Sequence, residues 1–289
     1  MKVSFIGLGV MGFPMSGHLI SKNSSLDINV YNRSIEKSEK WLSKFNGSLS
    51  TTPAEAAKNC DIVFMCVGND HDVNEVVRGE NGIMSSITEG SIIVDHTTAS
   101  AKITKEIYNY CKASKNVSFI DAPVSGGQAG AENGQLTIMV GGDEPIYLKI
   151  KPLLQSYAKN STLIGNSGSG QLAKMVNQIC IAGLLQGLSE AINFGQKVNL
   201  DMEKVIGVIK DGAASSWQMQ NRYQTMAKNE FDFGFAVEWM RKDLKICLEQ
   251  ADEVGARLPI TAIIDQFYSN ILDIGGKRWD TSSLIKLLR

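Results

Sequence analysis

The sequence predicts a doubly wound α/β sheet domain followed by an all-α domain, with a long helix linking the two. Three observations lead to this fold class. Short apolar strands alternate with amphipathic helical stretches in the first half of the chain, a glycine-rich turn follows the first strand, and strand patterns disappear from about Ser169. Repeated strand–helix–strand units are typical of a parallel sheet with helices on both faces. We therefore expect a sheet domain over residues 1–164 and a helical domain over residues 165–289.

Six short segments of the first domain have the apolar pattern of strands. They are Lys2–Ile6, Ile28–Tyr31, Asp61–Val67, Ser91–Asp95, Ser118–Asp121 and Thr137–Gly141. The helical patterns between them are Gly12–Lys22, Ile35–Phe45, Pro53–Lys58, Val73–Val77 and Ala101–Lys112. These stretches carry apolar residues three or four positions apart, a spacing that gathers them on one helix face.

Only helices are expected in the second domain. They are about Ser169–Lys197, Met202–Lys210, Ser216–Lys228, Val237–Val254, Pro259–Ile274 and Ser282–Leu288. The first of them is longer than an average helix and contains Gly183 and Gly187, which fits a partly buried helix that joins two domains. Pro259 suits a first helical turn, and Gly275 suits the end of the same helix.

Composition argues against several classes of partner. The chain has 289 residues, of which 43% are hydrophobic and 20% charged, and its formal net charge is −1. No broad basic field favours nucleic acid or an anionic membrane surface, and no apolar run approaches the roughly 20 residues of a membrane span. Five scattered cysteines without metal spacing fit a reducing compartment. With a first strand that begins at Lys2, we expect a cytoplasmic protein without a cleaved signal.

The turn after the first strand has the GxGxxG spacing of a dinucleotide site. It consists of Gly7, Leu8, Gly9, Val10, Met11 and Gly12. The first glycine permits the tight turn, the second lets the backbone approach a pyrophosphate, and the third lets helix and strand pack closely. The helix that follows presents free N–H groups to the phosphates. A strand before the turn and a helix after it are the context of a Rossmann-type NAD(P)-binding domain.

The end of the second strand indicates which dinucleotide is bound. An NAD-binding domain usually has Asp or Glu there, which holds the ribose 2′-hydroxyl. Here the place is taken by Asn32 and Arg33. No carboxylate repels a 2′-phosphate, and a guanidinium can pair with one while stacking on adenine. This pattern favours NADP over NAD.

Three further segments complete a set of motifs: DAPVSGG from Asp121, the spacing GxxGxGxxxKxxN from Gly165 to Asn177, and KDL from Lys242. With the glycine turn, they occur in the order of the β-hydroxyacid dehydrogenase family and cover nearly the whole chain. The chain therefore resembles this family, which includes 3-hydroxyisobutyrate dehydrogenases, tartronate semialdehyde reductases and glyoxylate/succinic semialdehyde reductases, and which is related to 6-phosphogluconate dehydrogenase.

The resemblance implies a role for each matching residue. Lys174 would be the catalytic group. The substrate ligands would be Ser125, Gly126 and Gly127 for a carboxylate, with Asn177, Lys242 and Asp243. Besides the glycine turn, Asn32 and Arg33, the cofactor would be lined by Val67, Gly68, Thr98 and Lys242. The chain departs from the family pattern in three places, with Gly68 and Ala101 where proline is usual and Gln178 where a second asparagine is usual.

The helical spacing of Lys174 and Asn177 supports this reading, since residues at i and i+3 share a helix face. We expect Lys174 to give a proton to the oxygen of a carbonyl whose carbon accepts hydride from the nicotinamide. A lysine suits this only where burial or a neighbouring cation such as Lys242 makes its proton easier to lose. The expected activity is NADP-preferring interconversion of a small β-hydroxyacid and its semialdehyde or keto form.

Two alternatives stay open: an NAD-dependent dehydrogenase of 3-hydroxyisobutyrate or a serine-type β-hydroxyacid, and a nucleotide-binding protein without catalysis. The presence of Lys174 argues against the second, and also against a related imine-reducing group. The expected partners are a small carboxylate substrate and further copies of the chain, as a homodimer or homotetramer. The predicted long helices carry more apolar positions than one buried face requires, which supports self-association.

Overall fold

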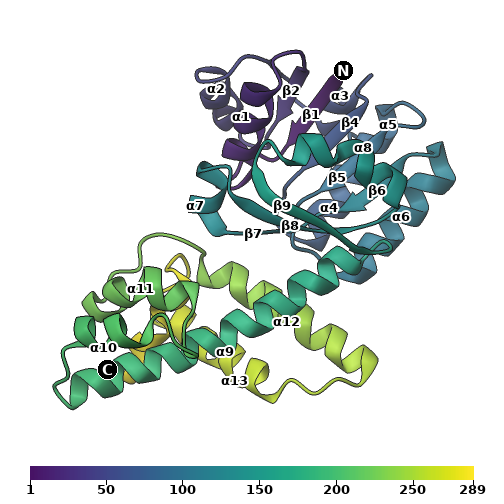
Figure 1. The fold of residues 1–289 in the computed structure, drawn as a ribbon. Helices are drawn as coiled ribbons and strands as arrows, with labels where there is room; N and C mark the ends of the chain where they lie inside the picture. The colour runs from purple at the N-terminus through teal and green to yellow at the C-terminus, as the bar shows by residue number, and fades with distance from the viewer. The chain divides into compact units, whose positions relative to one another are not determined.

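The structure, a computed structural model, describes residues 1–289 and contains two compact units, Met1–Lys174 and Met175–Arg289. The first is a mostly parallel sheet with helices, and the second is helical (Figure 1). This confirms the predicted fold class. The units divide ten residues after the predicted boundary, inside the long helix α9 (Ser169–Lys197). The first turns of α9 are hydrogen bonded to the sheet unit, which accounts for the later division.

The sheet has nine strands in the order β3-β2-β1-β4-β5-β6-β8-β7, with β9 paired to β8. The strands are β1 (Lys2–Ile6), β2 (Asp27–Tyr31), β3 (Ser48–Leu49), β4 (Ile62–Met65), β5 (Ile92–Asp95), β6 (Ser118–Asp121), β7 (Val124–Ser125), β8 (Leu136–Gly141) and β9 (Ala158–Gly165). After β1 the chain first adds β2 and β3 on one side of it, and then adds β4 and the following strands on its other side. The carboxyl end of β1 is therefore the topological switch point, where open α/β sheets bind their ligands.

The expectation of a parallel sheet is correct for β1 to β6 and wrong at β8. Strand β8 runs antiparallel to β6 and β7, while β9 runs parallel to β8. The connection from β7 to β8 contains only the short helix α7 (Gly127–Glu132), so the chain returns beside its own path instead of crossing over. An antiparallel pair needs no crossover helix.

Eight helices accompany the sheet. Besides α7 they are α1 (Gly12–Lys22), α2 (Ile35–Leu42), α3 (Pro53–Ala57), α4 (Asp70–Arg78), α5 (Ile83–Ser86), α6 (Ala101–Lys115) and α8 (Glu144–Leu154). The strands bury both faces, because neighbours such as Phe5 and Ile6 belong to different apolar clusters. Such two-sided burial is characteristic of parallel sheets.

The second unit contains the rest of α9 and the helices α10 (Met202–Ile209), α11 (Trp217–Lys228), α12 (Val237–Val254) and α13 (Pro259–Asp273). The last segment, Thr281–Leu288, is a 3₁₀ helix rather than the expected α-helix. Leu244, Tyr268 and Leu284 meet in the largest apolar cluster of this unit. Helix α13 begins with Pro259 and is followed by Gly275 at φ +86°, as the sequence predicts. No helix in either unit has the length and apolarity of a membrane span.

Candidate functional site

The glycine turn has the shape that a dinucleotide requires. Gly7 has φ +93°, and a Cβ there would overlap the carbonyl oxygen of Cys66. A Cβ on Gly12 would overlap the carbonyl oxygen of Gly7. Gly9, in contrast, faces open space, with no atom within 4 Å of a Cβ built on it. Two glycines therefore serve packing, and the third leaves the free backbone approach that a pyrophosphate needs.

The end of β2 supports this turn from one side. Gly7 N donates to the carbonyl of Tyr31 at 2.8 Å, and Leu8 N donates to the Asn32 side chain at 2.9 Å. The Asn32 amide also donates to the carbonyl of Ser34 at 3.0 Å. Asn32 stays a predicted cofactor residue, and in the structure its side-chain oxygen orients the glycine turn. Arg33 lies at the surface, with 89% of its side chain exposed.

The ends of β4 and β5 lie on the other side of the turn and are tied together. Val67 N donates to the Thr97 hydroxyl at 2.9 Å, and Thr97 N donates to the Asp95 carboxylate at 2.8 Å. After Gly68, the Asn69 side chain caps α4 by accepting from Asp72 N at 3.0 Å. The predicted cofactor residues Val67, Gly68 and Thr98 thus lie on two loops that one threonine side chain connects.

A buried carboxylate attaches the start of α9 to this edge of the sheet. Asp121, the last residue of β6, accepts from Gly168 N at 2.8 Å and from Gln171 N at 3.1 Å. Burial raises the pKa of the Asp121 carboxyl, while these backbone donors act in the opposite direction. A carboxylate at a helix N-terminus satisfies N–H groups that have no partner within the helix.

Gln171 connects α9 to the segment around Thr98. Its side-chain oxygen accepts from Ala99 N at 3.1 Å, and its amide nitrogen donates to the carbonyl of Thr97 at 2.7 Å. The buried Gln171 amide therefore holds the backbone on both sides of Thr98. Lys174 follows three positions later, on the same side of the helix, and is only 8% exposed. Gln171 and Asp121 are not among the predicted site residues, although both lie inside the matched motifs.

The predicted carboxylate loop follows β7. Ser125 ends that strand, and Gly126 and Gly127 have φ of +127° and +59°. A Cβ on Gly127 would meet no atom within 4 Å. Two successive glycines with positive φ give the loop a backbone path that few other residues adopt. The first residue of α7 therefore faces open space.

The remaining predicted residues belong to the second unit and form a group of their own. Gln178, 2% exposed, donates to the Asp243 carboxylate at 2.7 Å and thereby links α9 to α12. Its side-chain oxygen accepts from the Asn177 amide at 2.8 Å. Lys242 forms an ion pair with Asp243 at 3.3 Å. Gln178 therefore orients Asn177 and Asp243, a role that the sequence analysis left out.

A buried histidine ties the β5 loop to the β6 loop. His96 Nδ1 is 2.7 Å from the carbonyl oxygen of Ala122, and Nε2 is 2.9 Å from the Tyr157 hydroxyl. The neutral ring can donate to the first and accept from the second. Burial lowers the pKa of His96 to about 4.

This burial predicts pH-dependent stability. Below pH 6.5 the His96 side chain binds a proton in the unfolded chain but stays neutral in the folded chain. The free energy of unfolding therefore falls by up to about 1.4 kcal/mol per pH unit as the pH is lowered to about 4. Above pH 6.5 the contribution of His96 to the free energy of unfolding is fully present. Urea unfolding from pH 7.5 to 4 would measure it, with His96→Gln as the control because glutamine can still accept from Tyr157. We expect a flatter profile in the variant, and parallel profiles would contradict this assignment.

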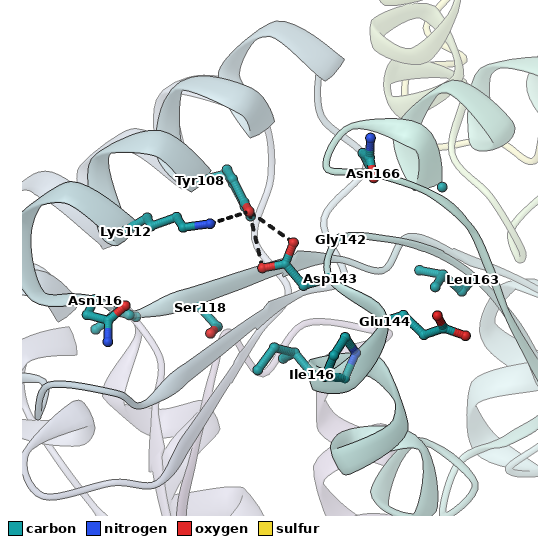
Figure 2. A pocket seen from close by; sticks show the side chains of 13 residues that line it. Tyr108, Lys112, Asn116, Ser118, Gly142, Asp143, Glu144, Ile146, Leu163 and Asn166 are labelled. Atoms are coloured by element: carbon teal, nitrogen blue, oxygen red, sulfur yellow. Dashed lines mark hydrogen bonds between the residues drawn. The ribbon is translucent and has the colours of Figure 1, made fainter.

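Two surface cavities differ in their relation to these residues. One, of about 580 Å³, is lined by Leu8, Gly9 and Val10 of the glycine turn and by lysines of α2. The other, of about 650 Å³, lies beside α6 and α8 (Figure 2). In it Tyr108 donates to Asp143 at 3.0 Å and accepts from Lys112 at 3.3 Å. None of the predicted site residues lines this second cavity, so we assign the site to the glycine turn.

Comparison with known proteins agrees with this geometry. A profile of the NAD binding domain of 6-phosphogluconate dehydrogenase matches residues 2–165, and one described as NAD-binding of NADP-dependent 3-hydroxyisobutyrate dehydrogenase matches residues 168–288. The 2-hydroxy-3-oxopropionate reductase of Escherichia coli is 35% identical over 289 residues, which cover 100% of this chain and 97% of that protein. The chain belongs to the β-hydroxyacid dehydrogenase family.

Two further comparisons concern a close relative in sequence and a solved structure of the same fold. An oxidoreductase of Shewanella frigidimarina is 54% identical over 287 residues, covering 99% of this chain and 98% of that protein. The solved structure of Mycobacterium tuberculosis 3-hydroxyisobutyrate dehydrogenase with L-serine shows the same fold, with a TM-score of 0.89 at 24% identity. The match covers 100% of this chain and 99% of the chain in that structure. The protein is therefore an NAD(P)-dependent β-hydroxyacid dehydrogenase or reductase that acts on a CH–OH group.

Proposed function

We propose that this β-hydroxyacid dehydrogenase prefers NADP and interconverts a small β-hydroxyacid with its semialdehyde or keto form, with Lys174 as the general acid and base. The observation that carries the proposal is the attachment of α9 to the Thr98 segment through Gln171, with the buried Lys174 one turn later. A proton-transferring group beside a nicotinamide-binding edge is what carbonyl reduction requires. The Escherichia coli relative is a 2-hydroxy-3-oxopropionate reductase, which supports a short substrate of this kind.

The residues of the first unit fit a nicotinamide dinucleotide. Gly9 leaves space for the pyrophosphate, and Arg33 extends into solvent beyond β2. On the other side of the glycine turn, the loops after β4 and β5 carry Val67, Gly68 and Thr98. When bound, the cofactor supplies or accepts a hydride. The protein contributes orientation and charge around the reacting atoms.

In the reductive direction, Lys174 donates a proton to the substrate oxygen as the carbonyl carbon gains hydride. In the oxidative direction, the neutral amine of Lys174 takes the hydroxyl proton. The loop of Ser125, Gly126 and Gly127 binds the substrate carboxylate, since its two glycines let backbone N–H groups approach an anion. Asn177 hydrogen bonds to the substrate oxygen or its carboxylate.

The substrate class can be tested directly by following NAD(P)H absorbance. The panel contains glyoxylate, succinic semialdehyde, tartronate semialdehyde, 3-hydroxyisobutyrate and serine, each with both cofactors. We expect turnover of a short semialdehyde or keto acid that is faster with NADPH than with NADH. Exclusive oxidation of 3-hydroxyisobutyrate or serine with NAD would support the alternative reading and overturn ours.

Arg33→Ala should discriminate between the two cofactors. Arg33 is the exposed cation that follows β2, and none of the residues Asn32-Arg33-Ser34 is a carboxylate that would hold a ribose 2′-hydroxyl. Loss of a charge-assisted contact to the 2′-phosphate predicts a rise of roughly 10- to 100-fold in the KM for NADPH. The KM for NADH should change less than about three-fold, since NADH lacks that phosphate. Equal changes in the two KM values would mean that Arg33 does not act through the 2′-phosphate.

Self-association as a homodimer or homotetramer stays a prediction. It is supported by exposed apolar side chains on the helices of the second unit, which a folded chain alone leaves in water. They are Val176 and Phe194 on α9 and Ile260 and Ile263 on α13.

A further inference from the structure

An ion pair connects the segment after β2 with helix α4. Arg33 Nη1 is 3.8 Å from Asp72 Oδ1. Arg33 follows β2, Asp72 lies in α4 after β4, and β1 runs between these two strands in the sheet. Because the glycine turn follows β1, the pair spans the side of the turn where an adenosine ribose would lie.

The two partners differ in how firmly they are held. Asp72 is in the first turn of α4, and its backbone N–H donates to the capping Asn69 side chain. Only 27% of the Asp72 side chain is exposed, compared with 89% for Arg33. The Asp72 side chain therefore stands on a capped helix and is mostly buried, whereas the exposed guanidinium can turn toward a ligand.

We propose that Asp72 is the internal counter-ion of Arg33 and determines how strongly the enzyme distinguishes NADP from NAD. The inference rests on the proposed function, in which Arg33 pairs with the 2′-phosphate. A 2′-phosphate competes with Asp72 for the guanidinium and is also repelled by its carboxylate. NAD, whose 2′-hydroxyl is uncharged, meets neither effect. Asp72 therefore weakens NADP binding selectively and keeps the cofactor exchangeable.

Asp72→Asn tests this with little change of shape. Competition against bound NADPH would give the affinities of 2′,5′-ADP and 5′-AMP, which differ only in the 2′-phosphate. Removing one partly exposed charge predicts roughly five-fold tighter binding of 2′,5′-ADP and less than two-fold change for 5′-AMP. The ratio of kcat/KM for NADPH to that for NADH should rise by a similar factor. Both gains should shrink in high salt.

Two further variants complete the design. Glu36→Gln removes an exposed charge three residues from Arg33 that forms no ion pair within 4 Å, and it should leave the 2′,5′-ADP affinity unchanged within about two-fold. In an Arg33→Ala background, Asp72→Asn should lose most of its effect. Asp72→Ser should reproduce the result of Asp72→Asn, so a folding defect of one variant would not decide the outcome.

The outcomes separate this inference from the function on which it rests. If Arg33→Ala leaves 2′,5′-ADP binding unchanged, the 2′-phosphate role of Arg33 is wrong. If Arg33→Ala weakens that binding while Asp72→Asn and Asp72→Ser match the unmodified enzyme, the phosphate role stands and the counter-ion role is overturned. An equal gain for 5′-AMP and 2′,5′-ADP would also overturn it, because the effect would then not involve the phosphate.

Discussion

Lys174→Ala is expected to lower kcat by about 10²- to 10⁴-fold, the range that a positioned general acid or base contributes. The buried start of α9 is fixed by Asp121 and Gln171, so removing the lysine side chain should leave its surroundings in place. We therefore expect the dissociation constant of NADPH to change by less than about three-fold. Single-turnover kinetics with saturating substrate would measure the chemical step, and cofactor fluorescence would measure binding.

Controls on the same helix make this test specific. Lys197→Ala removes the exposed lysine at the far end of α9 and should leave kcat unchanged. Lys174→Met keeps most of the volume and removes the proton donor, so it should lose as much activity as Lys174→Ala. A loss of only a few-fold in both Lys174 variants, with cofactor binding intact, would take this residue out of the chemistry.

The sequence predicts most elements of the two units because their ends carry strong local signals. Helix α1 begins at Gly12, and α12 is followed by Gly255, which has φ +71°. Helix α8 is missed because Pro152 lies inside it, and an interior proline weakens a helical pattern. Strand β9 is missed because its burial alternates along AKNSTLIG with little apolar content. The direction of β8 could not be predicted, since residue alternation is the same in parallel and antiparallel strands.

The candidate site shows the same limit more clearly. The motifs predict which residues carry the chemistry, but the side chains that hold them bond to partners distant in sequence. Gln171 reaches Thr97 across 74 residues, and Gln178 reaches Asp243 across 65. Amide side chains have no local pattern that predicts such bonds. These roles can be seen only in the folded chain. The start of α9 packs on the sheet edge within the first unit, and the rest of α9 packs on α12 within the second.

Asp72 illustrates a related point about charge. At the sequence level the absence of a carboxylate after β2 favours NADP, and Arg33 is the only charged residue of Asn32-Arg33-Ser34. The fold then brings a carboxylate to Arg33 from α4, on the other side of β1. The cofactor preference that we propose therefore depends on residues after two different strands, which no single motif contains.

Gly9→Ala and Gly12→Ala should separate cofactor binding from folding. A Cβ on Gly9 meets no atom within 4 Å, so we expect the free energy of unfolding to change by less than about 1 kcal/mol. The same methyl group would occupy the space of the pyrophosphate and should weaken NADPH binding by roughly 100-fold. A Cβ on Gly12 overlaps the backbone of Gly7, which predicts a loss of about 3 kcal/mol or more in stability.

Thermal unfolding without cofactor, together with NADPH titration of each variant, distinguishes these effects. Gly9→Ala should keep the Tm of the unmodified chain and lose most of the stabilisation that added NADPH provides, because a ligand that binds the folded chain raises the free energy of unfolding by RT ln(1 + [NADPH]/Kd). Gly12→Ala should have a lower Tm at every cofactor concentration. Normal NADPH affinity in a stable Gly9→Ala variant would mean that the open face of this turn is not where the phosphates bind, and the dinucleotide would have to be placed elsewhere on the sheet edge.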